Sequence, residues 1–160
     1  MRLLAVVCTA LLLSIGVSVA TAAEMDGFRG LKWGSEPAAL SIFGQKKVEG
    51  HMGAVPGVQA YQLNNDDLVF GGVKATSIVY AFFKGRFTSV SIDFVGFDNF
   101  EKMQAYCKQL FGPVTNSATM KQEHYVSFDG PKTGALLLYQ FSMGYNSYGR
   151  LYLYSKEYLQ

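Results

Sequence analysis

Cys107, His51 and His124 are the side chains of this sequence best suited to nucleophilic or general-base chemistry. A hydrolase needs a nucleophile held beside a base. His51 lies in a glycine-rich segment, His124 begins an alternating run, and neither belongs to a catalytic motif of known spacing. We therefore assign no catalytic residue, and a small hydrolase or redox enzyme that uses Cys107 or His124 remains the alternative hypothesis.

Cys107 lies in a segment with helical periodicity. Its apolar residues share one helix face and are Phe100, Met103, Cys107, Leu110 and Phe111. Asp98 as a cap and Glu101 three residues later form a capping box, and Gly112-Pro113 ends the pattern. The sequence therefore predicts a helix over 99–111 with Cys107 buried in its apolar stripe, where a cysteine behaves as a small hydrophobic residue.

The remaining polar groups give weaker signals for a metal or an acid–base pair. His51 and Met52, with Met25, Met120 or His124, could form a soft copper site, but their spacing is not diagnostic. The carboxylates at 66–67 belong to a turn and Asp93 lies among serines on a strand, so we interpret all three as solvated. We predict no cofactor and no metal site.

Tyrosines are concentrated at the end of the chain, where six of the ten lie between Tyr139 and Tyr158. Strand alternation over 148–154 places four side chains on one face, and these are the candidate binding residues: Tyr148, Arg150, Tyr152 and Tyr154. Two interpretations remain open. Cross-strand tyrosine pairs stabilise a sheet without any partner, whereas a tyrosine surface with one arginine suits contact with a protein or a glycan.

These residues must be positioned by a sheet and by helices. Alternation predicts strands over 58–63, 68–70, 76–83, 87–94, 123–128, 135–141 and 148–154, with a hairpin at Lys84-Gly85-Arg86. In the strand 87–94, Ser89, Ser91 and Asp93 are predicted to face solvent. A first helix is predicted from the cap Ser35 through Pro37 to Gly44.

Together these elements predict an α+β fold. We expect an antiparallel sheet of about five to seven strands with two helices packed on one face. Both predicted helices end in Phe-Gly, at Phe43-Gly44 and Phe111-Gly112, which suggests a helix-then-strands unit used twice.

The first 23 residues indicate export. Arg2 precedes an apolar run over 3–19, and Ala20-Thr21-Ala22-Ala23 offers a signal-peptidase site after Ala22 or Ala23. Residues 24–160 suit a single domain. Basic and acidic residues nearly balance and form no basic stripe, so we predict no nucleic-acid partner.

A short motif follows the predicted signal peptide. The residues Phe28-Arg29-Gly30-Leu31-Lys32-Trp33-Gly34 resemble a Phe-Arg-Gly-x-x-Trp-Gly start found in small exported bacterial proteins of unassigned function. More distantly, the spacing from Gly34-Ser35 to Phe43-Gly44 is similar to an element of the β-lactamase inhibitor proteins and of the small lipoprotein of the outer-membrane barrel-assembly machine. This resemblance implies helices on one face of an antiparallel sheet and a non-catalytic role.

The sequence thus predicts an exported protein, periplasmic or secreted, that acts as a non-enzymatic binding or envelope-associated protein. Its expected partner is an envelope or secreted protein, met through the tyrosine and arginine face of 148–154. We expect no transmembrane anchor in the mature chain, and a monomer or weak dimer.

Overall fold

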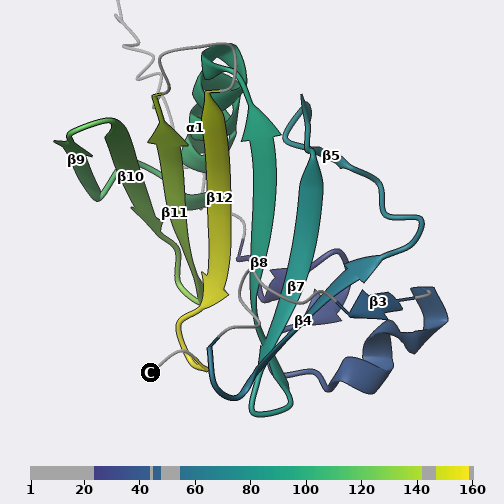
Figure 1. Ribbon diagram of the computed structural model, residues 1–160. Helices are drawn as coiled ribbons and strands as arrows, with labels where there is room; N and C mark the ends of the chain where they lie inside the picture. The colour runs from purple at the N-terminus through teal and green to yellow at the C-terminus, as the bar shows by residue number, and fades with distance from the viewer. Residues whose placement is uncertain (1–23, 44, 48–54, 142–146, 159–160) are drawn as a thin grey trace, which may run out of the picture.

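The computed structural model describes residues 24–43, 45–47, 55–141 and 147–158, and its main element is an eight-stranded antiparallel sheet (Figure 1). From one edge to the other, the strands are β3 (Gln45–Lys47), β4 (Val58–Leu63), β7 (Ser77–Phe83), β8 (Arg86–Val95), β12 (Tyr148–Ser155), β11 (Thr133–Gln140), β10 (Glu123–Asp129) and β9 (Asn116–Met120). Seven of them have five or more residues, and β3 has three. The sequence missed β3 and β9, which are a short edge strand and a polar one.

One α-helix explains the strand order. The helix α1 (Phe97–Phe111) carries the chain from β8 in the middle of the sheet to β9 at its edge. The chain then returns through β10 and β11 until β12 pairs with β8. The last strand therefore lies at the centre of the sheet, where its two neighbours cover both of its edges.

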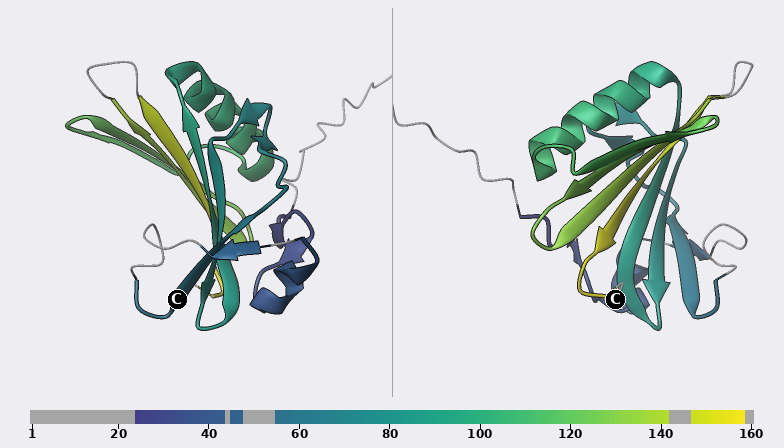
Figure 2. Two further views of the ribbon diagram at one scale, coloured as in Figure 1. Left: turned by 45° about the vertical axis from the view of Figure 1, so that its right-hand side comes forward. Right: turned by 90° about the vertical axis from the view of Figure 1, so that its left-hand side faces the viewer.

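Two small hairpins lie on the side of the sheet that α1 covers. They are β1 (Gly27–Phe28) with β2 (Leu31–Lys32), and β5 (Val69–Phe70) with β6 (Val73–Lys74). Figure 2 shows α1 and the N-terminal hairpin on the same side of the sheet. Phe28 of the first hairpin contacts Phe70 of the second with ring centroids 5.4 Å apart, and Phe70 contacts Tyr106 of α1 at 5.1 Å. The two hairpins and the helix thus form one covering layer.

The core lies between this layer and the inner face of the sheet. The residues of α1 that reach it are Phe100, Met103, Cys107 and Phe111, which follow the predicted apolar stripe. Burial of Cys107 in the core is therefore confirmed. Gly149 of β12 is required here, because a Cβ atom at this position would lie 2.1 Å from Cε2 of the buried Phe94 ring.

The predicted fold class, an α+β fold with two helices packed on one face of the sheet, was wrong. The segment predicted as a first α-helix is the 3₁₀ helix η1 (Pro37–Phe43), with a backbone hydrogen bond from the amide of Ala39 to the carbonyl of Glu36 at 3.0 Å. Seven residues are too few to offset the cost of nucleating an α-helix without strong packing. The described chain is therefore mostly β with one α-helix, and two equivalent helix-then-strands units are not present.

The start of α1 also differs from the prediction. The helix begins at Phe97 with Gly96 as its N-cap, and no side chain caps it, so the predicted capping box of Asp98 and Glu101 is not formed. Gly96 has φ 89°, a backbone conformation that glycine adopts readily. Packing of the Phe97 ring against Phe100, with centroids 5.8 Å apart, favours this earlier start.

The solvent-facing side predicted for β8 was wrong as well. Ser89, Ser91 and Asp93 are at most 4% exposed, so β8 is buried on both faces. Their partners on β12 carry long side chains, because Ser91 pairs with Tyr152 and Asp93 pairs with Arg150. Small polar residues between large neighbours lose contact with water even though none of the described helices covers this face.

Candidate functional site

The N-terminal motif forms the β1–β2 hairpin and holds it against the sheet. Arg29 and Gly30 occupy the turn with φ 50° and 80°, which is the conformation required by tight hairpin turns. The Trp33 ring stacks on Phe87 at 4.7 Å, and its Nε1 donates a hydrogen bond to Thr133 Oγ1 at 2.7 Å. The motif therefore places Arg29 at a fixed point beside the sheet.

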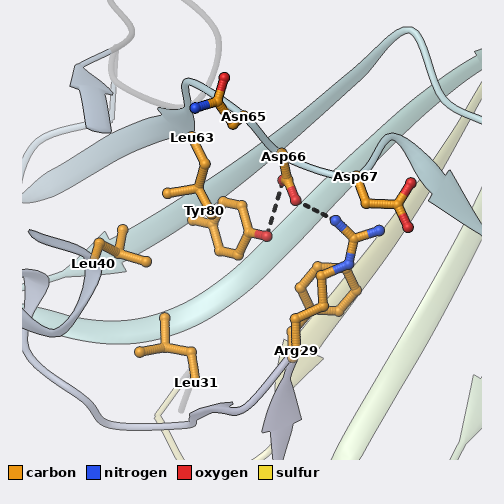
Figure 3. A pocket seen from close by; sticks show the side chains of 9 residues that line it. Arg29, Leu31, Leu40, Leu63, Asn65, Asp66, Asp67 and Tyr80 are labelled. Carbon is orange, nitrogen blue, oxygen red and sulfur yellow. Dashed lines mark hydrogen bonds and ion pairs between the residues drawn. The ribbon is translucent and has the colours of Figure 1, made fainter. Parts of the chain in front are cut away.

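Arg29 lies at the edge of a cavity of 420 Å³ between the N-terminal hairpin, η1, β4 and β7. The cavity is lined by Phe28, Arg29, Leu31, Leu40, Leu63, Asn65, Asp66, Asp67 and Tyr80. Figure 3 shows the leucines gathered around the Tyr80 ring, with Arg29 and Asp66 at the other end. An apolar cavity of this size with a few converging polar groups is typical of a small-molecule site.

The polar end of the cavity is a hydrogen-bonded network. Arg29 Nη1 pairs with Asp66 Oδ1, and Arg29 Nη2 donates to the carbonyl of Val69 at 2.8 Å. The Tyr80 hydroxyl donates to Asp66 Oδ2 at 3.0 Å. Burial, and then the negative charge of Asp66, raise the pKa of Tyr80, so this hydroxyl keeps its proton at neutral pH.

The turn at residues 64–67 supplies the mouth of the cavity. Asp67 Oδ1 accepts a hydrogen bond from the amide of Val69 at 3.0 Å, which fixes the turn as an Asx-type structure. Asn65 and Asp67 are exposed, whereas the Asp66 side chain is only 9% exposed. The sequence identified this turn but interpreted both carboxylates as solvated. No local pattern could show that Asp66 meets Arg29, 37 positions earlier.

The predicted binding residues do share one face of β12. Tyr148, Arg150, Tyr152 and Tyr154 are all half-buried on the side of the sheet opposite α1. Arg150 donates from Nε and Nη2 to both carboxylate oxygens of Asp93, at 2.5 and 3.0 Å, and from Nη1 to the Tyr152 hydroxyl at 2.9 Å. The Tyr148 hydroxyl donates to Asp93 at 2.8 Å. We call Asp93, Tyr148, Arg150 and Tyr152 the arginine cluster.

Within the arginine cluster, the positive charge of Arg150 is compensated by the carboxylate of Asp93. The Arg150 guanidinium lies 5.2 Å from the centroid of the Tyr148 ring and 5.5 Å from that of Tyr152. Burial works against the charge of Arg150, but its hydrogen bonds to Asp93 and Tyr152 outweigh burial and raise its pKa. Burial and the hydrogen bond to Asp93 also raise the pKa of Tyr148. These contacts support the interpretation that the cluster stabilises the sheet, and a binding role for this face stays a prediction.

The two residues of the enzymatic alternative lie apart, Cys107 in the core and His124 against Thr119 and Phe100. Cys107 is 0% exposed, and burial raises the pKa of its thiol to about 12, so almost none of it is thiolate at neutral pH. His124 Nδ1 lies 2.9 Å from Thr119 Oγ1, and its ring packs against Phe100 at 5.6 Å. Within the described residues no hydrogen bond or ring contact joins Cys107 to His124.

The residues that the structure describes include no group of three His, Cys, Asp or Glu side chains arranged to hold a metal ion. His51 and Met52, two members of the predicted copper site, lie outside those residues. Among the described helices none has the length and hydrophobicity to cross a membrane.

Comparisons with known proteins identify no relative. No family model matches the chain, no curated protein matches it, and no solved structure matches its fold. The resemblance of the N-terminal motif to small exported bacterial proteins therefore stays a prediction.

Proposed function

We propose that this is an exported, non-enzymatic binding protein that holds a small, mainly apolar molecule in the cavity beside Arg29. The observation that carries the proposal is the cavity of 420 Å³, whose apolar wall of three leucines and Phe28 ends in the network of Arg29, Asp66 and Tyr80. Its apolar wall would release water on binding, and its polar end would orient the bound molecule.

The cavity supports binding better than catalysis. Its polar side chains form hydrogen bonds with one another, and the described residues of its lining include no cysteine, serine or histidine that could serve as a nucleophile or a neutral-pH base. Asp66 accepts hydrogen bonds from the guanidinium of Arg29 and the phenol of Tyr80, so both of its carboxylate oxygens are already engaged. The network therefore positions a ligand and does not activate one.

Filling the cavity should abolish binding of an apolar probe. Leu63 lines the cavity and is only partly buried, so Leu63→Trp can direct its larger ring into the space without entering the tightest part of the core. We expect N-phenyl-1-naphthylamine to bind the wild-type protein with a rise in fluorescence, and Leu63→Trp to lose at least tenfold in affinity, about 1.4 kcal/mol.

The matched control is Leu138→Trp, which places the same ring on the half-buried opposite face of the sheet. It should bind the probe like the wild type, and circular dichroism should show that both variants are folded. Equal binding by both variants, or no binding by the wild type, would refute a ligand site in this cavity.

Export is supported by residues 1–23, which lie outside the described part of the chain. Expressed with its full N-terminus in a bacterial host, the protein should accumulate in the periplasm or the medium, and its intact mass should correspond to cleavage after Ala22 or Ala23. An uncleaved mass in the cytoplasmic fraction would contradict this proposal.

A further inference from the structure

The charges around the cavity are unequal. Among the described residues of its lining, two are carboxylates, Asp66 and Asp67, and one is a guanidinium, Arg29. Arg29 is engaged by Asp66 and by the carbonyl of Val69, and its guanidinium carbon lies 5.1 Å from the centroid of the Phe28 ring. An anion entering the cavity would have to compete with Asp66 for this guanidinium. The positive charge of Arg29 is therefore already compensated by Asp66.

Asp67 carries the negative charge that is left once Arg29 and Asp66 compensate each other. One of its carboxylate oxygens accepts the Val69 amide, and in the described part of the chain no cation forms a salt bridge with it. Asp66 retains lone pairs beyond those used by Arg29 and Tyr80, since each carboxylate oxygen can accept two hydrogen bonds.

We infer that the cavity selects an amphipathic amine, with its apolar body against Leu31, Leu40 and Leu63 and its ammonium group at Asp66 and Asp67. This inference rests on the proposed function and adds the chemical class of the ligand. An ammonium group has three N–H donors and can use the lone pairs of Asp66 that Arg29 and Tyr80 leave free, without displacing Arg29. A carboxylate head group would face Asp67 and gain nothing from the paired Arg29.

The test compares three ligands with one chain and different head groups. Decylammonium, decanol and decanoate are titrated below their micellar concentrations against protein loaded with N-phenyl-1-naphthylamine at pH 7.4 and low salt. Because Asp67 is exposed, its pairing with an ammonium should be weak, and we expect decylammonium to displace the probe at about threefold to fivefold lower concentration than decanol. Decanoate should be the weakest of the three, and added salt should reduce the preference.

The variant Asp67→Asn should remove most of the preference for decylammonium over decanol. Its matched control, Glu101→Gln, removes an exposed carboxylate on α1 and should leave the preference unchanged. If the probe binds but decanol or decanoate displaces it as well as decylammonium does, the amine inference is overturned and the binding function stands. If the wild type does not bind the probe, the proposed function itself fails.

Discussion

Arg150→Ala should lower the free energy of unfolding by about 3–5 kcal/mol, because it removes one partner of a buried ion pair. The Asp93 side chain is 6% exposed and would lose the two guanidinium hydrogen bonds that compensate its burial. Tyr148 and Tyr152 would also lose the cation that lies against both of their rings. Urea unfolding at pH 7, followed by circular dichroism, measures the difference.

The matched control is Arg86→Ala, which removes an arginine from an exposed pair. Arg86 Nη1 lies 3.9 Å from Glu36 Oε1, with both side chains more than half exposed, so we expect a loss below about 1 kcal/mol. If Arg150→Ala cost no more than the control, the arginine cluster would not be needed for stability. The prediction that this face binds a protein or glycan would then be strengthened.

The stability of the protein should fall steeply above pH 9, and Cys107 should account for much of the loss. Burial raises the pKa of this thiol from 9.0 to about 12, so the folded protein keeps a proton that the unfolded chain releases. The contribution of a group with a raised pKa is fully present below pH 9 and disappears as the pH rises towards 12. At about 1.4 kcal/mol per pH unit, the loss amounts to about 4 kcal/mol.

Urea unfolding of the wild type and of Cys107→Ala, at intervals from pH 8 to 11 with a reductant present, isolates this effect. The alanine variant should be less stable at pH 8 because it leaves a small cavity, but its stability should fall less with pH. Tyr80 and Tyr148 also have raised pKa values and act in both proteins, so only the difference reports on Cys107. Parallel curves would mean that the thiol ionises in the folded state, which would favour the enzymatic alternative.

Local sequence patterns predicted most of the described strands and the helix α1. The alternation in 76–83 and 87–94 matches β7 and β8, and the helical stripe around Cys107 matches the buried face of α1. These features repeat every two residues or about every 3.6 residues, so a single segment contains the whole signal. The prediction of an α-helix over 37–43 was wrong, because the apolar residues of this segment fit either kind of helix and its short length favoured the 3₁₀ form.

Burial of polar side chains could not be predicted in the same way. Alternation correctly placed Ser91 and Asp93 on the opposite face from Val90 and Ile92. The alternation predicted that this face of β8 is exposed to solvent. The sequence does not show that β12 pairs with β8 and brings Arg150 to Asp93, 57 positions away, where it helps to bury this face. The sequence therefore identified the right face of β12 without identifying the carboxylate that its arginine contacts.

By itself, the sequence determined most of the strands, the apolar face of α1 and the tyrosine-rich face of β12, since each of these depends on residues close together in the chain. Only the tertiary structure decided that the β1–β2 hairpin, η1, β4 and β7 enclose a cavity, and that Arg29, Asp66 and Tyr80 meet at its end. The physical reason is that these contacts form when the sheet and its covering layer pack together. A cavity is the space that such packing leaves between segments distant in sequence, and it has no local pattern of its own.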